Sequence, residues 1–133
     1  MIYALDTNIV IHLLRNDIKV KCKFNNTVEN GAAIIIPAFV NYEMRRGFHY
    51  RPAPAKEMLY NELCSHFAVG EMTLTVWEYA ARLYANLRKA GFTVEDADIL
   101  IAAFCIVNDC TLVTNNIKHF KDINGLSYIN WNE

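Results

Sequence analysis

Cysteine pairs of the kind that hold metals or staple small secreted proteins are missing from this sequence. None of the four cysteines belongs to a C-x-x-C pair, and none has a histidine at zinc-finger spacing. A disulfide framework is typical of shorter, loop-rich secreted chains, whereas Cys105 lies in a strongly apolar stretch. We therefore expect reduced, buried thiols.

An excess of basic charge and long apolar runs are missing as well. The net charge is −1, which excludes binding of nucleic acid through a global positive charge. The apolar runs are too short to cross a bilayer. The N-terminus has no basic segment, and Asp6 interrupts the first apolar run, so no signal peptide is expected. Together these absences predict a cytoplasmic protein without membrane contact.

The chain does have enough apolar residues for one folded domain. Its 133 residues are 53% hydrophobic, and a chain of this length buries roughly two thirds of its unfolded surface. We find no repeat, linker or low-complexity segment. The sequence therefore predicts a single domain spanning residues 1–133.

Short apolar strands alternate with longer helical patterns, which is typical of an α/β protein with a mostly parallel sheet. Strands are expected at residues 2–5, 32–37, 72–75 and 111–114, with an edge strand near 127–131. Helices are expected at residues 7–14, 17–30, 38–50, 55–68, 76–90 and 95–109. Pro37 is expected at the first position of its helix.

Three acidic residues stand in apolar surroundings, where an unpaired charge is costly. Asp6 ends the first strand, where open α/β sheets build their sites, although a helix N-cap is the alternative. Most helical neighbours of Glu43 are apolar or glycine, and the alternative there is an ion pair with Arg46. Asp98 begins an apolar stripe, and the helix N-terminus eases its charge by only about 0.3–1 kcal/mol. It therefore needs another partner, whereas Asp96 suits ordinary helix capping.

Convergence of the three acids at the carboxyl edge of the sheet explains all three positions together. Like charges at close range repel strongly in a low dielectric and require protons or cations. An oxygen-only ligand set without histidine or cysteine suits Mg²⁺ or Mn²⁺. Thr114 follows a strand at the same edge and is expected to orient a water or a carboxylate; an ordinary turn motif is the alternative.

Four motifs in order carry a resemblance to a known family: L-D-T-N, E-M-R-R-G, D-A-D-I-L-I-A-A and L-V-T-N-N-x-x-x-F. Over nearly the whole chain the sequence resembles the PIN domain, most closely the VapC-type ribonuclease toxins of toxin–antitoxin pairs. The resemblance implies an α/β, PIN-like fold: a four- to five-stranded, mostly parallel sheet with helices on both faces. It also implies Mg²⁺-dependent endoribonuclease activity. Our mechanistic hypothesis is in-line attack by a metal-activated water, which leaves 5′-phosphate and 3′-hydroxyl ends.

The resemblance implies the catalytic acids and the metal ligands, and our mechanistic hypothesis assigns the other roles. The catalytic acids are Asp6, Glu43 and Asp98. The metal is held by Asp6 and Asp98, and Glu43 orients the water or helps to hold a second, substrate-borne metal. Supporting roles fall to Thr7, Asn8, Asp96, Thr114 and Asn116. Contacts to RNA phosphates are expected from Arg45, Arg46 and Lys89.

One position departs from the family pattern, and several partners are implied. Many PIN domains have an acid where this chain has Asn116, which weakens the case for a second tightly held metal. The implied partners are a cognate antitoxin, a second copy in a homodimer, and a transfer or ribosomal RNA substrate. The antitoxin's C-terminal segment is expected along the active-site groove, with an arginine near the acids.

Two alternatives stay open at this point. A phosphatase of the haloacid-dehalogenase type also begins with a strand that ends in aspartate, but it needs a second acid where this chain has Asn8. A PIN-like module that binds RNA or an antitoxin without cutting is favoured only by Asn116. A small overlapping gene upstream is the observation that favours the toxin.

Overall fold

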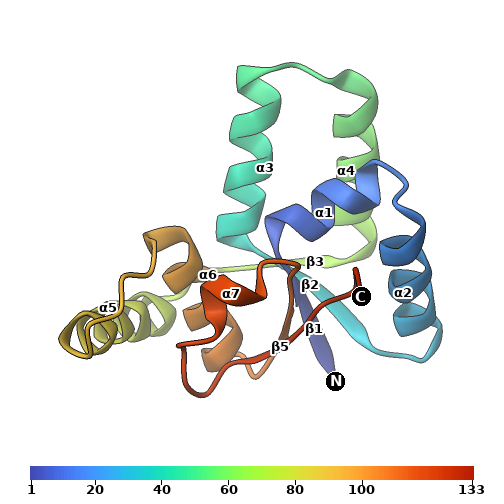
Figure 1. Ribbon diagram of the computed structural model, residues 1–133. Helices are drawn as coiled ribbons and strands as arrows, with labels where there is room; N and C mark the ends of the chain where they lie inside the picture. The colour runs from blue at the N-terminus through green and yellow to red at the C-terminus, as the bar shows by residue number, and fades with distance from the viewer.

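A five-stranded parallel sheet forms the centre of the protein in the computed structural model, which describes residues 1–133 (Figure 1). The strands are β1 (Ile2–Leu5), β2 (Ala33–Pro37), β3 (Ala68–Gly70), β4 (Thr111–Val113) and β5 (Ser127–Ile129). Their order is β3-β2-β1-β4-β5, and every neighbouring pair is parallel. The predicted fold class is therefore confirmed.

Helices cover both faces of this sheet. They are α1 (Thr7–Leu14), α2 (Ile18–Glu29), α3 (Ala38–Tyr50), α4 (Pro54–His66), α5 (Leu74–Lys89), α6 (Asp96–Val107) and α7 (Ile117–Phe120). The chain steps from β1 to β2 to β3 in one direction and then returns to β4 and β5 on the other side of β1. Because parallel crossovers are right-handed, α1 to α4 lie on one face and α5 to α7 on the other.

The core explains why α6 is so apolar. This helix lies against the sheet and packs extensively on α5, so that six of its twelve residues are buried. They join β1, β2 and β4 in one cluster of 28 buried apolar residues. A helix that is apolar nearly all round is expected in such a central place. The register then fixes the site: Leu5 pairs with Val113, so β1 and β4 end side by side.

Two local predictions are wrong. The segment 72–75 is no strand, because the Thr73 hydroxyl accepts a hydrogen bond from the backbone N–H of Val76 at 3.3 Å and caps α5. The third strand lies earlier, at Ala68–Gly70, and begins at the last residue assigned to the preceding helix. Pro37 ends β2 and caps α3 instead of opening it. The one-turn helix α7 was not predicted.

The structure also tests the expectations about disulfides and membrane-spanning helices. All four cysteines are free, and Cys105 and Cys110 are buried, as predicted. Cys22 is exposed, contrary to expectation, because α2 buries only Val20. No helix is long and apolar enough to span a bilayer.

Candidate active site

Asp6 is the buried centre of the polar groups at the carboxyl edge of the sheet. It ends β1 and caps α1, and it is only 5% exposed. Its Oδ1 accepts a hydrogen bond from the backbone N–H of Thr7 at 2.8 Å, and its Oδ2 accepts one from the Thr114 hydroxyl at 2.7 Å. No lysine or arginine lies within ion-pair distance. Asp6 is therefore both the N-cap of α1 and a residue of the candidate site.

Glu43 reaches the same place from α3. The Thr7 hydroxyl donates a hydrogen bond to Glu43 Oε1 at 2.6 Å, so Thr7 contacts one acid through its backbone and another through its side chain. The Arg46 guanidinium stands 3.5 Å from Glu43 Oε2. The glutamate side chain is 17% exposed, whereas that of the arginine is 57% exposed. Glu43 is thus mostly buried beside Thr7 and also makes the ion pair that was its alternative explanation.

Asp98 comes from the first turn of α6 and has a partner that the sequence did not suggest. The Nδ1 atom of His119, on α7, lies 3.2 Å from Asp98 Oδ2. The two residues line a cavity of about 220 Å³, together with Lys118 and other residues from the turns around α6 and α7. The histidine side chain is 53% exposed, and it is the only group within ion-pair distance of this acid.

The charges of neighbouring acids influence the pKa values of Asp6 and Asp98. Burial raises the pKa of Asp6, the hydrogen bonds from Thr114 and Thr7 lower it, and the charge of Glu43 raises it again. Burial also raises the pKa of Asp98; His119 lowers it, and the charges of Asp6 and Glu95 raise it. Asp6 thus interacts electrostatically with both other acids, whereas the convergence of all three on one cation stays a prediction.

The loop after β4 holds Asp6 from the other side. Thr114 is fully buried, donates to Asp6 and accepts from the backbone N–H of Asn116 at 3.0 Å. Next to it, the Asn115 amide lies 3.0 Å from His12 Nε2, and His12 Nδ1 lies 3.4 Å from Asp17 Oδ2. This second network ties the loop to the end of α1.

The donor set fits a hard divalent cation held mainly by water. No group of three histidine, cysteine, aspartate or glutamate side chains is arranged to hold a metal on its own. Mg²⁺ does not need such a group, because it binds through one or two carboxylates and keeps several waters. The observation in favour is Asp6 itself, a buried carboxylate with two acidic neighbours and no cationic partner. Asp6 and Asp98 are the residues that could hold the ion.

The family model of the PIN domain matches residues 3–126. The chain belongs to the PIN-domain family. Ribonuclease VapC2 of Rickettsia felis is 29% identical over the full length of both chains, and Ribonuclease VapC1 of Haemophilus influenzae (strain R2866) is 26% identical over 98% of each. A solved structure of VapBC2 from Rickettsia felis bound to promoter DNA has a TM-score of 0.90, 27% identity and 98–99% coverage. VapBC from Salmonella typhimurium, at 22% identity and a TM-score of 0.88, shows the fold alone.

Four other residues of this PIN domain that were predicted to take part in the site make no hydrogen bond or ion pair with the three acids. Asn8 lies half-buried in the first turn of α1, and Asp96 is exposed beside the apolar side chains of α5. Arg45 turns toward α4, where it pairs with Glu57 at 3.6 Å and lies over the ring of a buried tyrosine. Lys89 ends α5, exposed and without an ion pair. For all four, a role at the site stays a prediction.

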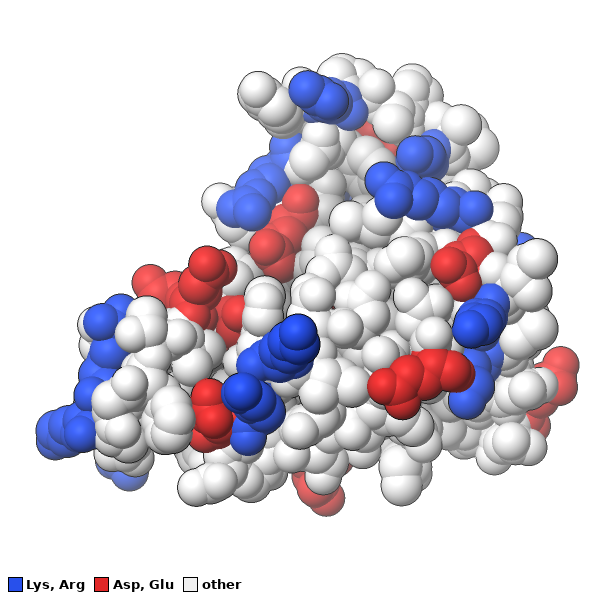
Figure 2. All heavy atoms as spheres, viewed as in Figure 1, with Lys and Arg blue, Asp and Glu red and all other residues white.

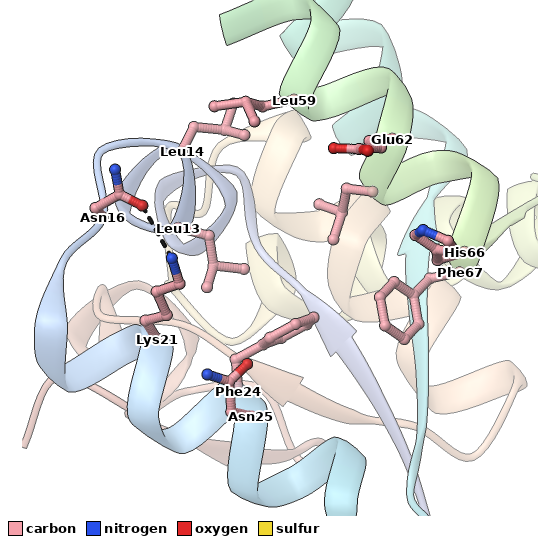
Figure 3. A pocket seen from close by; sticks show the side chains of 11 residues that line it. Leu13, Leu14, Asn16, Lys21, Phe24, Asn25, Leu59, Glu62, His66 and Phe67 are labelled. Atoms are coloured by element: carbon pink, nitrogen blue, oxygen red, sulfur yellow. Dashed lines mark hydrogen bonds between the residues drawn. The ribbon is translucent and has the colours of Figure 1, made fainter.

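The surface around the site alternates in charge. Figure 2 shows acidic side chains gathered between the lower part of α3 and the α5–α6 region, with basic side chains on both sides of them. A separate apolar groove of about 370 Å³ lies between α1, α2 and α4 (Figure 3). Leucines and phenylalanines line it together with two asparagines, Lys21, Glu62 and His66, and it contains none of the three acids.

Sequence analysis missed His119 and the direct Thr7–Glu43 contact. The only signal for His119 was its place three residues after Asn116, one helical turn into a helix that was not predicted. Thr7 was assigned a supporting role, but its hydroxyl could not be paired with a residue 36 positions away from spacing alone.

Proposed function

We propose that this PIN domain is a divalent-metal-dependent endoribonuclease, the toxin of a toxin–antitoxin pair. The observation that supports this most is the buried Asp6 carboxylate, which has acidic neighbours from α3 and α6 and no lysine or arginine partner. The relatives named as ribonucleases match the whole chain. Mg²⁺ is the proposed cation, with Mn²⁺ as a substitute, because the ligands are oxygen atoms.

Each side chain has a distinct part in the proposed reaction. Asp6 and Asp98 would hold the cation, and Glu43 would orient the attacking water and accept its proton. Thr114 fixes the Asp6 carboxylate, and Asn116 supports the loop. When bound, the cation makes the water more acidic and balances the charge that develops on the phosphoryl oxygen. In-line attack by water forms the new phosphorus–oxygen bond and breaks the bond to the 3′ oxygen, which takes a proton from solvent, so the products have 5′-phosphate and 3′-hydroxyl ends.

Cleavage of RNA by purified protein, free of any antitoxin, tests this proposal. We expect cleavage with Mg²⁺, none with a chelator, and a loss of at least about a hundredfold in Asp6→Asn, since removing a group that stabilises the transition state typically costs this much. A phospho-aspartate trapped on Asp6 would instead support the phosphatase. Binding of RNA without cleavage under all conditions would support the non-catalytic module.

We further propose a cognate antitoxin as the partner, since solved relatives of this fold are toxin–antitoxin complexes. The apolar groove between α1, α2 and α4 suits an apolar segment of that antitoxin, and its C-terminal segment continues toward the acids. An arginine there would find three carboxylates with few cations of their own.

The other parts of the proposal concern assembly and substrate. We propose a homodimer, supported by three exposed apolar side chains along α5: Leu74, Trp77 and Tyr84 are 87%, 46% and 42% exposed. The proposed substrates are transfer or ribosomal RNA in the cytoplasm. Arg46 is the one arginine or lysine within ion-pair distance of the three acids and the best candidate for a phosphate contact.

A further inference from the structure

A short stack of side chains runs outward along α3, beside Glu43. Phe39 is packed against the core, and its ring centroid lies 5.7 Å from that of Tyr42. The guanidinium of Arg46 lies over the Tyr42 ring, 5.3 Å from its centroid. Tyr42 is 53% exposed, and the Arg46 side chain is 57% exposed. The stack is therefore fixed to the core at one end and open to solvent at the other.

The position of this stack ties it to the active site. Arg46 contacts both the Tyr42 ring and the Glu43 carboxylate, so one guanidinium joins the stack to a catalytic acid. These residues lie in the first three turns of α3, the part of that helix nearest the carboxyl edge of the sheet (Figure 1). A phosphate at the acids would carry its neighbouring nucleotide to within reach of this stack.

We infer that Tyr42 and Arg46 form a subsite for one unpaired nucleobase next to the bond that is cut. Aromatic rings and arginine planes are the surfaces on which single-stranded RNA bases stack. The subsite rests on the proposed function, because only an RNA substrate at the acids brings a base here. A base in a duplex is already stacked on its neighbours, so the subsite selects an unpaired nucleotide.

The test measures binding of single-stranded RNA by fluorescence anisotropy in the Asp98→Asn background, where cleavage is blocked. The RNA is an oligonucleotide that spans the bond cut by the wild-type protein. We expect Tyr42→Ala to raise Kd by about 5- to 150-fold, the range for loss of one stacked base. Tyr42→Phe should bind as tightly as the parent, because stacking needs the ring and not the hydroxyl. Tyr50→Ala is the matched control, since Tyr50 is 83% exposed at the far end of the same helix.

Oligonucleotides with a single abasic position identify the contact. One abasic position should weaken binding by the parent protein. The same position should not change binding by the Tyr42→Ala variant, because that variant has no ring on which the base could stack. The inference is overturned if Tyr42→Ala binds like the parent, if no abasic position shows this pattern, or if the variant changes the oligomeric state, which would assign the ring to a protein contact. If the wild type cuts no RNA, the proposed function fails, and binding of single-stranded homopolymer RNA still tests the subsite.

Discussion

At the scale of single residues, the buried carboxylates of the site are expected to lower the free energy of unfolding. Asp6 is buried beside Glu43 and within the field of Asp98, and its two hydrogen bonds do not offset the loss of water, since its pKa remains raised. Such strain is common where a ligand later supplies the missing interaction. The carboxylate edge is therefore expected to be the least stable part of the metal-free protein.

Stability should fall as the pH rises above the ordinary aspartate pKa of 3.8. A raised pKa in the folded state means that the native protein holds protons that the unfolded chain has already released, so unfolding is favoured as pH rises through this window. We expect Asp6→Asn to flatten the decline and to be more stable than the wild type at pH 7 in chelator. Urea unfolding at several pH values measures this. Glu29 is exposed, so the stability of Glu29→Gln should depend on pH as that of the wild type does. An Asp6→Asn variant that is less stable than the wild type at pH 7 would contradict the account.

Thr7 should act as a positioning residue for Glu43. Thr7→Val removes the hydroxyl that donates to Glu43 Oε1, and we expect about a 10- to 100-fold loss of cleavage, the usual cost of losing an outer partner of a metal site. Thr7→Ser keeps the donor and should keep most activity.

A double-mutant cycle makes this prediction sharper. If Thr7 acts through Glu43, Thr7→Val should have little further effect in a Glu43→Gln background, because coupled residues are not additive. Thr75→Val, on the exposed side of α5, controls for the substitution itself. Equal losses in Thr7→Ser and Thr7→Val, or fully additive effects, would assign Thr7 to the helix start alone.

At the scale of elements, the sheet and its helices hold the acids at a common edge through close packing. β3 passes so near α6 that a methyl group on Gly70 would collide with the Phe104 ring and lie 2.8 Å from Ile35 Cδ1. Phe104 is 1% exposed in the middle of α6, the helix that carries Asp98. Glycine at this position therefore lets the strand and the helix approach each other.

Gly70→Ala should destabilise the protein by about 1–3 kcal/mol, as overpacking of a core does. Gly47→Ala is the matched control, because Gly47 lies inside α3 with nothing within 4 Å of an added methyl group. Alanine there should stabilise by up to about 1 kcal/mol through helix propensity. The midpoints of urea unfolding measure both. A Gly70→Ala variant as stable as Gly47→Ala would show that β3 and α6 can move apart freely.

Most strands and helices of this fold could be predicted from the sequence, and a few could not. Periodicity located β1, β2, β4 and most helices, since these are buried on both faces or amphipathic. It failed for β3, whose three residues carry little apolar signal, and for α7, which is one turn long. The acids were found because each is out of place in an apolar pattern. His119 and the Thr7–Glu43 bond depend on which surfaces meet, and local patterns do not contain that information.

At the scale of the whole molecule, the acids and the apolar groove are two separate surfaces, and we propose a different task for each. Leu59 lines the groove and is 45% exposed, whereas its neighbour Met58 is 71% exposed and does not line it. We expect Leu59→Asp to weaken binding of the proposed antitoxin by at least about tenfold, since a buried charge in an apolar contact is costly. Met58→Asp should bind normally, and calorimetry measures both. Equal affinities would place the antitoxin elsewhere.

The central claim is that Asp6, Glu43 and Asp98 form one cation-dependent site that hydrolyses RNA. Analysis of the RNA ends made by the purified protein, with Mg²⁺ and with chelator, tests it most directly. The account predicts 5′-phosphate and 3′-hydroxyl ends that appear only with the cation. Ends carrying a 2′,3′-cyclic phosphate, or cleavage that persists in chelator, would contradict it, because both mean that RNA is cut without a water activated at these acids.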